Sequence, residues 1–302
     1  MNSHNSRFMF AAGFVLAGSL VFLACKSRSS QGENSLQIKG SDTMVNLGQA
    51  WAEEFMKLRP EYSVAVTGGG SGTGISSLIN NTCDIAEVSR EMKAGEIDMA
   101  KSKGVTPFEI KVALDGLAVI VHPSNPVSEL TIEQLADIFI GRVTNWKQVG
   151  GRDEKIVLLS REVNSGTHVY FKEHVVRKGV ADGKEEFAPE ALMLPSSQAI
   201  ADEVAQNPDA IGYFGMGYIT KKEKAIHVAM SSGAPYVAPT MENVVTGDYP
   251  ISRPLLMYTK GEPQGAVKAF IDFVLSPEGQ TVVKKIDFVP VKPVEHGTAP
   301  IR

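Results

Sequence analysis

The sequence has little cysteine and no excess of positive charge. Only two of its 302 residues are cysteines, Cys25 and Cys83, so at most one intrachain disulfide could form and the fold must depend on its apolar core. The 30 basic and 34 acidic residues give a net charge of −4, whereas a nucleic-acid-binding surface is usually basic. With 43% apolar and 21% charged residues, the composition is that of a globular protein rather than a disordered chain.

Metal-ligand spacing and internal repeats are also missing from the sequence. The length is compatible with one large domain or with two of medium size. We expect neither a metal nor any other cofactor, because the six histidines show no metal-binding pattern. They are His4, His122, His168, His174, His227 and His296.

One long apolar run is present, and it lies at the N-terminus. Residues 8–24 carry no charge and follow Arg7, which is the arrangement of a secretory signal. The run is shorter than the roughly 20 residues of a membrane-spanning helix. Cys25 directly follows a small residue, which resembles the cleavage site of bacterial lipoproteins. We therefore predict a lipoprotein-type signal peptide over residues 1–25, lipidation of Cys25, and a flexible tether over residues 26–35. The alternatives are a cysteine that simply ends a signal peptide and an uncleaved anchor.

The body of the chain alternates strand-like and helix-like segments, which predicts an α/β architecture. Residues 36–39 have the pattern of a strand, and apolar residues at intervals of three or four predict a helix from about residue 44 that Pro60 ends. Further strands are expected at residues 63–67, 84–86, 116–122, 156–160, 211–214 and 255–259, and further helices at residues 75–80, 131–140, 165–177, 197–206 and 265–275, with a last helix after Ser276.

Three segments share the order of a strand, a loop of Ser, Thr or Gly, and a helix. They are residues 40–43 (GSDT), residues 68–74 (GGGSGTG) and residues 160–167 (SREVNSGT). Each loop places hydroxyls and backbone N–H groups at a helix N-terminus, where the amides have no intrahelical partner and the helix dipole favours an anion. If the three loops converge, they form a cage of neutral donors for an oxyanion.

The glycine-rich second loop fits none of the common nucleotide or nucleophile motifs. Thr73 occupies the position of the last glycine both in the dinucleotide pattern G-x-G-x-x-G and in the nucleophile elbow G-x-S-x-G. Ile75 stands where a P-loop needs lysine. A plain turn would explain one such loop, whereas three similar loops favour an oxyanion site.

Two arginines are candidates for the charge that faces such an anion. Arg161 lies in the third loop, and a guanidinium matches an oxyanion bidentately. Arg90 follows the expected strand at residues 84–86, and a surface ion pair, for example with Glu91, explains it equally well.

In combination, these segments resemble the phosphate-binding proteins of bacterial ABC importers. The resemblance implies a type II periplasmic-binding-protein fold, with two α/β lobes that are joined by two crossing strands and close like a hinge over the ligand. We accordingly expect a first lobe over residues 36–114 and 231–302 and a second lobe over residues 115–230. The resemblance runs from about residue 36 to residue 290 and is carried by residues 40–44, 68–75, 84–90, 130–135, 139–146, 160–167 and 211–213.

The same resemblance implies which residues bind phosphate and where this chain departs from the family. An aspartate of well-known members, which accepts a hydrogen bond from protonated phosphate, is replaced by Ser89. A serine can donate as well as accept, so we expect weaker rejection of sulfate unless Asp42 or another acid enters the site. Val163 replaces the usual acidic partner of Arg161, and Glu162 is the expected substitute. The expected phosphate-binding residues are Thr43, Met44, Ser71, Ser89, Arg90, Arg161, Ser165, Gly166 and Thr167.

The function that these expectations describe is that of a monomeric receptor rather than an enzyme. The protein would be exported to the periplasm or cell surface and held at the membrane by the lipid on Cys25. It would deliver phosphate to the permease subunits of an ABC importer and bind no nucleic acid. The alternatives are another oxyanion such as sulfate or molybdate, a phosphate sensor without transport, and a phosphate-ester hydrolase, for which we find no nucleophile and base. Cys83 is expected to be a buried thiol.

Overall fold

The computed structural model describes residues 34–291. The predicted signal peptide, Cys25 and most of the predicted tether lie outside the described residues. The strands are β1 (Ser35–Gly40), β2 (Ser63–Thr67), β3 (Ile85–Val88), β4 (Pro107–Val121), β5 (Glu129–Thr131), β6 (Val157–Arg161), β7 (Leu192–Leu194), β8 (Ala210–Gly215), β9 (Lys224–Ala225), β10 (His227–Ala229), β11 (Ser252–Lys260) and β12 (Val289–Pro290). The helices are α1 (Val45–Leu58), α2 (Ser71–Ile79), α3 (Ala94–Ser102), α4 (Ile132–Phe139), α5 (Gly166–Phe171), α6 (Ser197–Gln206), α7 (Met241–Thr246), α8 (Gly265–Val274) and α9 (Pro277–Lys285), with short turns η1 (Trp146–Val149), η2 (Lys172–Val176) and η3 (Met216–Tyr218).

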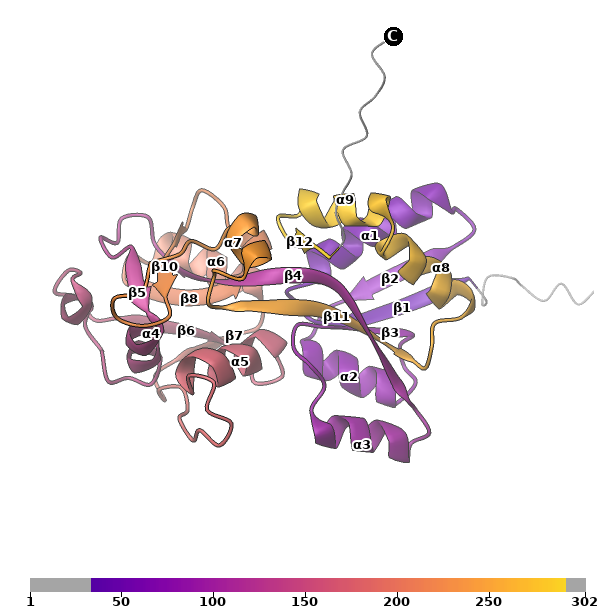
Figure 1. Cartoon of the computed structure of the whole chain (residues 1–302), viewed down its shortest axis with the longest axis horizontal. Helices are drawn as coiled ribbons and strands as arrows, with labels where there is room; N and C mark the ends of the chain where they lie inside the picture. Colours follow the sequence, from indigo (N-terminus) through magenta and orange to yellow (C-terminus); the bar gives the residue numbers. More distant parts are fainter. Residues whose placement is uncertain (1–33, 292–302) are drawn as a thin grey trace, which may run out of the picture.

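Two α/β lobes lie side by side and share one ten-stranded sheet (Figure 1). The sheet has the strand order β2-β1-β3-β11-β4-β8-β6-β7, with β9 and β12 pairing with β4 as well. Strand β4 is long enough to serve both lobes, because its first half pairs with β11 and its second half with β8. Strands β4 and β11 are therefore the two crossing strands, and the predicted fold class is confirmed.

The second crossing lies later in the chain than the sequence predicts. The residues from 231 to 251 stay with the second lobe, where Val237 bridges to Val228 and the Tyr249 hydroxyl donates to the carbonyl of Leu117. The chain returns only through β11, so the boundary expected between residues 230 and 231 is too early. We define the first lobe as residues 34–114 and 253–291 and the second lobe as residues 115–252, because Arg253 pairs with Asp115 in the register of β11 and β4.

Helices cover both faces of the sheet in the first lobe. The apolar side of α1 faces the sheet through Leu47, Trp51 and Phe55, as its periodicity predicts. The Phe55 ring meets Phe270 of α8 edge to face, with centroids 5.3 Å apart. Helices α2 and α3 cover the opposite face, and Cys83 is buried there as a small apolar residue, as expected. The lobe is thus a three-layer sandwich.

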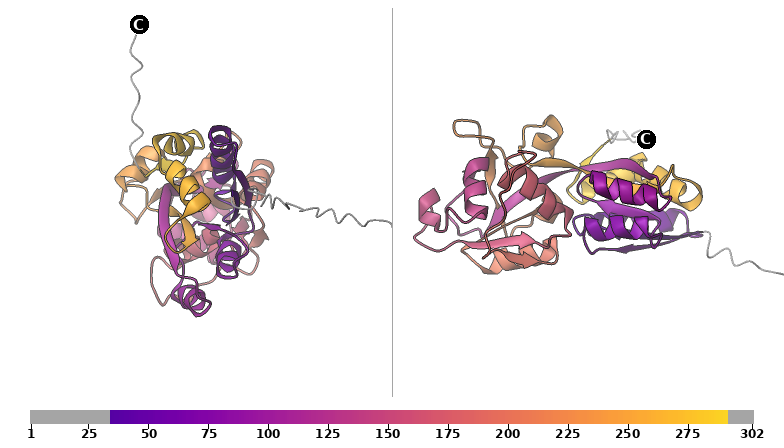
Figure 2. Two further views of the ribbon diagram at one scale, coloured as in Figure 1. Left: turned by 90° about the vertical axis from the view of Figure 1, so that its right-hand side faces the viewer. Right: turned by 90° about the horizontal axis from the view of Figure 1, so that it is seen from below.

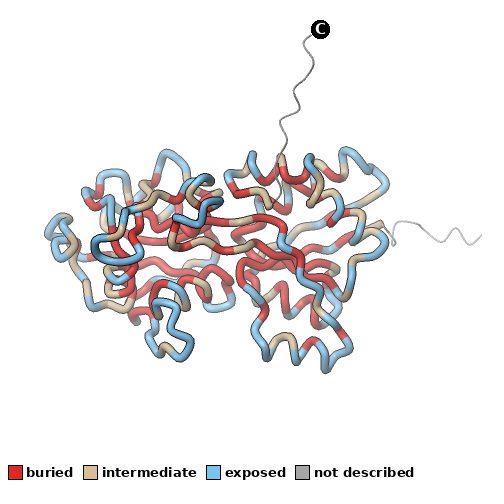
Figure 3. Tube along the Cα trace, viewed as in Figure 1, coloured by how far each residue is buried: buried red, intermediate tan, exposed pale blue. Residues whose placement is uncertain are grey.

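The second lobe repeats this three-layer arrangement around its own part of the sheet. Helix α6 packs on one face, and α4 and α5 pack on the other. The Phe171 and Tyr213 rings stack at 3.8 Å between centroids. Seen from below, the lobes remain separate bodies joined by the crossing strands (Figure 2), and buried residues follow the strands through both (Figure 3). Helices α1, α2 and α5 each follow a parallel strand of one of the lobes, which positions their N-termini for the site described next.

Candidate anion-binding site

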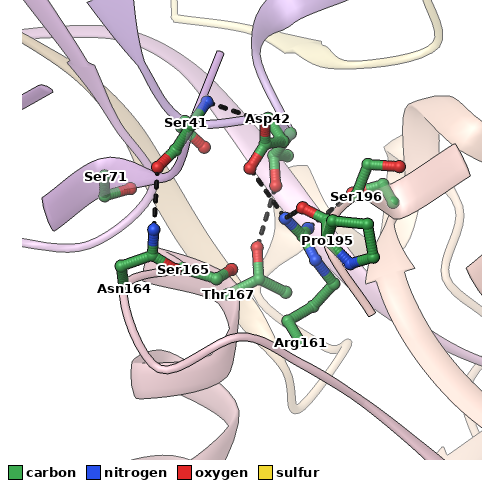
Figure 4. Close-up of polar contacts among 12 residues, drawn as sticks. Ser41, Asp42, Ser71, Arg161, Asn164, Ser165, Thr167, Pro195 and Ser196 are labelled. Carbon is green, nitrogen blue, oxygen red and sulfur yellow. Dashed lines mark hydrogen bonds and ion pairs between the residues drawn. The ribbon is translucent and has the colours of Figure 1, made fainter. Parts of the chain in front are cut away.

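The three serine-, threonine- and glycine-containing loops converge where the lobes meet. The second and third loops touch directly across the lobe boundary, since the Gly72 N–H donates to the Asn164 carbonyl at 3.0 Å. The Asn164 amide in turn donates to the Gly69 carbonyl at 2.9 Å (Figure 4). The first loop is linked to the second, because the Gly69 N–H donates to Asp42 at 3.0 Å. The loops come from both lobes, so residues of both lobes form the site.

Buried hydroxyls from these loops and from Ser89, which directly follows β3, form a group that we call the hydroxyl cluster, made of Ser41, Thr43, Ser71, Ser89 and Thr167. Thr43 and Thr167 come from opposite lobes, and their hydroxyl oxygens are 2.8 Å apart. Ser89 accepts a hydrogen bond from Ser41 at 2.9 Å and lies 3.3 Å from the Ser71 oxygen. All five residues are buried, so their hydroxyls are concentrated in a space with little water.

Glycine is required at two points where backbone comes close to this cluster. A Cβ atom on Gly166 would lie 2.3 Å from the Ser71 hydroxyl and 2.6 Å from that of Ser89. Gly70 has φ of +89°, a conformation that favours glycine, and its Cβ would lie 2.8 Å from the Asn164 carbonyl. The lack of a side chain at Gly166 therefore allows its backbone to lie against the hydroxyls of Ser71 and Ser89. Ser165, one residue earlier, is buried and accepts from the His168 N–H as the cap of α5.

Met44 and Arg90 lie differently from the other expected site residues. The Met44 side chain is fully buried in the core, and its N–H donates to the Ser41 carbonyl at 2.9 Å. The Arg90 guanidinium pairs with Glu96 of α3 at 2.7 Å and donates to the Glu91 carbonyl. The structure therefore does not bring Arg90 into the hydroxyl cluster, and its ion-pair partner is Glu96 instead of Glu91.

Arg161 spans the lobe boundary as part of an ion pair. Its Nη2 donates to Asp42 of the first lobe at 2.8 Å (Figure 4). The expected partner Glu162 is wrong, because Asp42 takes that place and Glu162 is exposed while Arg161 is buried. Other Arg161 donors are used within the second lobe, where Nη1 reaches the Ser197 hydroxyl at 3.1 Å and Nη2 the Pro195 carbonyl at 2.9 Å.

A second buried guanidinium at the site was missed by the sequence analysis. Nη2 of Arg253 lies 3.1 Å from the Thr167 hydroxyl and 3.4 Å from that of Thr43, and Nη1 donates to the Ser89 carbonyl at 3.0 Å. Its Nε and Nη2 also donate to Oδ2 of Asp115 at 3.0 and 2.8 Å. The signal for this pair was available, since each residue is a single charge inside an apolar run of the sequence.

Burial shifts several pKa values around the site. Burial raises the pKa of Asp115, although Arg253 and the N–H of Met216 oppose the shift. Burial raises the pKa of Tyr218 to about 12, so its hydroxyl remains a donor, and it reaches the Asp42 carbonyl at 2.7 Å. Burial lowers the pKa of His168 to about 4, so this histidine, although next to the third loop, is neutral at physiological pH.

The described residues contain neither a metal-ligand cluster nor a membrane-spanning helix. Between residues 34 and 291, no group of three or more His, Cys, Asp or Glu side chains is placed to hold a metal ion. In the same part of the chain, no helix combines the length and apolar character needed to cross a bilayer.

Comparison with known proteins gives one consistent family. The family model of the PBP superfamily domain matches residues 27–278. The phosphate-binding protein PstS of Pseudomonas aeruginosa is 32% identical over 311 residues, covering 94% of each chain. The protein of the same name from Bacillus subtilis is 35% identical over 272 residues, covering 88% of this chain and 85% of its own.

Solved structures agree with these sequence relatives. A Clostridium perfringens structure with bound phosphate has a TM-score of 0.77 at 36% identity and covers 86% of this chain and 100% of that chain. An ABC-type phosphate transport receptor from Vibrio cholerae has a TM-score of 0.67 at 33% identity and covers 84% of this chain and 99% of that one. The chain belongs to the PBP superfamily and, within it, to the family of the PstS phosphate-binding proteins.

Proposed function

We propose that the protein is an extracytoplasmic receptor that binds inorganic phosphate between its lobes and delivers it to the permease subunits of an ABC importer. The observation that carries this proposal is the hydroxyl cluster, in which donors from both lobes meet. Binding of an anion to both lobes at once favours the closed state, and a difference in affinity between the two states is what allows a ligand to drive closure. The names of the relatives and the phosphate in the Clostridium perfringens structure support the same ligand.

The ligand is held by hydroxyls and backbone in this proposal. Met44 is left out, since its side chain belongs to the core and its N–H donates to the Ser41 carbonyl. Arg90 is left out, because it faces Glu96. The proposed side-chain and backbone ligands are Thr43, Ser71, Ser89, Ser165, Gly166 and Thr167.

Calorimetric titration with phosphate tests the proposal. The wild-type protein should bind phosphate with a stoichiometry of one, and phosphate should raise its unfolding temperature because only the folded state binds. Thr167→Val should weaken binding at least about tenfold, since each hydrogen bond to a charged group contributes about 1.5–3 kcal/mol. Thr281→Val is the matched control, because the Thr281 hydroxyl bonds to Pro277 on the exposed side of α9. If the wild-type protein binds sulfate or molybdate but not phosphate, that oxyanion replaces phosphate as the ligand.

We also propose that the protein binds phosphate without transforming it. The serine–histidine pair at the third loop is Ser160 with His168, at 3.3 Å. Both residues are buried, and the Ser160 hydroxyl is bonded to the Tyr213 hydroxyl at 2.7 Å, which leaves it poorly placed for attack on a phosphate ester. Turnover of a chromogenic phosphate ester that Ser160→Ala abolishes would contradict the proposal.

Membrane attachment through Cys25 and a monomeric state complete the proposal. Cys25 lies outside the described residues, and the support for its lipidation is the apolar run that precedes it. Cys25→Ser should release the exported protein from the membrane fraction. Mass spectrometry of the wild-type N-terminus should show a diacylated or triacylated cysteine.

A further inference from the structure

We infer that Arg253 is the cationic ligand of the bound anion and that Asp115 is the residue that positions it. The inference rests on the proposed phosphate-binding function and adds a residue pair that comes from the two crossing strands. Arg253 lies on β11, Asp115 lies opposite it on β4, and both side chains are completely buried.

The guanidiniums of Arg161 and Arg253 are both buried at the lobe boundary, and their hydrogen-bond partners differ. Arg161 directs its N–H groups at Asp42, the Ser197 hydroxyl and the carbonyls of Leu194 and Pro195. None of these acceptors belongs to the hydroxyl cluster. Arg253 instead directs Nη2 at the two hydroxyls of Thr167 and Thr43. Arg253 is therefore the arginine that faces the hydroxyl cluster.

The hydroxyls of Thr43 and Thr167 have a limited set of directions in which they can donate. A hydroxyl has one hydrogen and two lone pairs. A threonine oxygen that accepts from Nη2 of Arg253 has its own hydrogen available for another acceptor. One of the two hydroxyls donates to the other across 2.8 Å, so the pair has one hydrogen left over. An oxyanion that accepts this hydrogen lies beside the guanidinium, where charge-assisted hydrogen bonds are strongest.

Asp115 fixes the orientation of the Arg253 guanidinium. Oδ2 of Asp115 accepts from both Nε and Nη2 of Arg253, and its Oδ1 accepts from the Met216 N–H at 3.0 Å. The carboxylate thus lies on the Nε side of the guanidinium, and the Nη groups face the Ser89 carbonyl and the threonine hydroxyls. Asp115 balances the charge without taking the position of the ligand.

The surroundings of this pair include other titratable groups. The Arg253 guanidinium lies 5.6 Å from the centre of the Tyr170 ring of α5. It also borders a cavity of about 400 Å³ between the lobes, whose lining includes Arg90, Glu91, Lys93, Glu173 and His174. Tyr249 lies near Asp115 on the other side, and burial together with Asp115 raises its pKa.

The test compares phosphate affinity and its pH profile in variants that keep the buried charges balanced. Arg253→Met combined with Asp115→Asn removes both charges and leaves neither one unpaired. Phosphate gains its second negative charge near neutral pH, so the wild-type affinity should rise from mildly acidic to mildly alkaline conditions. The double variant should bind roughly 10- to 100-fold more weakly, and this rise should be lost, because a guanidinium favours the dianion most.

Three further variants separate a ligand from a structural role. Arg253→Lys should weaken binding but keep the rise with pH, because the ammonium keeps the charge without the planar fork. Asp115→Asn should weaken binding less than the double variant and also keep the rise. Arg90→Met removes a nearby buried charge outside the hydroxyl cluster, and His174→Gln removes the titratable histidine of the cavity. Both should match the wild-type profile.

The outcomes distinguish this inference from the proposed function. A wild-type protein that does not bind phosphate overturns the proposed function. A wild-type protein that binds, together with a folded double variant of equal affinity and equal pH profile, overturns the inference alone. If the double variant does not fold, an Arg253→Lys protein with unchanged affinity overturns it as well. If Arg90→Met loses as much phosphate affinity as the double variant, the loss comes from the long-range electrostatic field of buried positive charge. That result overturns the inference.

Discussion

Glu87 has a fully buried carboxyl group that lacks a hydrogen-bond partner in the described part of the chain. It lies on β3, two residues before Ser89, and its side chain faces α1 so closely that a Cβ on Gly48 would be 2.4 Å from Oε1. Burial raises the pKa of Glu87 well above its ordinary value of 4.5. Burial thus favours the protonated form of this carboxyl, since a charged group without a partner is costly to bury.

This buried acid predicts a pH-dependent stability. Between the ordinary pKa of the unfolded chain and the raised pKa of Glu87, the folded state binds more protons than the unfolded state. The free energy of unfolding therefore falls as pH rises through that window. Glu87→Gln removes the titrating group and should remove this part of the decline, so the variant gains stability relative to wild type with increasing pH. Urea unfolding at a series of pH values measures the difference, and parallel curves for the two proteins would contradict the assignment.

Ser89 predicts the selectivity of the site between phosphate and sulfate. The two acids near the hydroxyl cluster are already engaged, Asp42 by Arg161 and the Gly69 N–H, and Asp115 by Arg253. Neither carboxylate is therefore free to accept a hydrogen bond from protonated phosphate, which leaves phosphate with little advantage over sulfate. Sulfate should bind measurably at millimolar concentration in calorimetric titration. Ser89→Asp introduces an obligate acceptor and should weaken sulfate more than phosphate. The absence of detectable sulfate binding to the wild-type protein would refute this prediction.

At the scale of elements, local patterns predicted most of the fold. The predicted apolar face of α1 and its end before Pro60 are confirmed, and Thr131 caps α4 as expected. The helix expected over residues 165–177 is in fact α5 followed by the π-helical turn η2. A change from α- to π-type hydrogen bonding leaves the apolar pattern almost unchanged, so periodicity could not detect it.

The site was predictable wherever it lies in a local motif and not where it depends on long-range register. The loops around Thr43, Ser71 and Thr167 are visible in the sequence because each joins a strand to a helix. Arg253 reaches its place only because β11 pairs with β4 at a particular register, and 138 residues separate it from Asp115. Neither the hydrophobic periodicity of the sequence nor its amino-acid composition specifies that register.

Close packing of the second and third loops predicts the effect of a single methyl group. The added Cβ in Gly166→Ala would lie 2.3 Å from the Ser71 hydroxyl of the other lobe, so it hinders closure. Phosphate affinity should fall at least about tenfold, a loss of about 1.4 kcal/mol. Gly95→Ala on α3 is the control, since no atom lies within 4 Å of its Cβ. Titration of both variants checks this, and equal affinities would show that the loops adapt.

At the scale of the whole molecule, a net charge of −4 is compatible with an anionic ligand. The ligand would meet hydroxyls and backbone in a closed site, where local donors outweigh the average charge of the surface. Each buried arginine faces a carboxylate, Arg161 with Asp42 and Arg253 with Asp115, so the site carries no large excess of either sign. A net negative exterior would slow the approach of an anion, chiefly at low ionic strength.

Closure of the lobes should depend on the Asp42–Arg161 ion pair. This pair joins the lobes at 2.8 Å, with Arg161 1% and Asp42 16% exposed. Asp42→Asn should favour the open state and weaken phosphate binding about tenfold, because a ligand that requires the closed state loses affinity in proportion to the population of that state. Small-angle X-ray scattering should show a larger radius of gyration for the variant without phosphate and convergence with wild type at saturation. Asp137→Asn, which breaks the exposed Arg142 pair within one lobe, should change neither quantity. An unchanged radius and affinity in Asp42→Asn would mean that the hydroxyl cluster alone holds the lobes together.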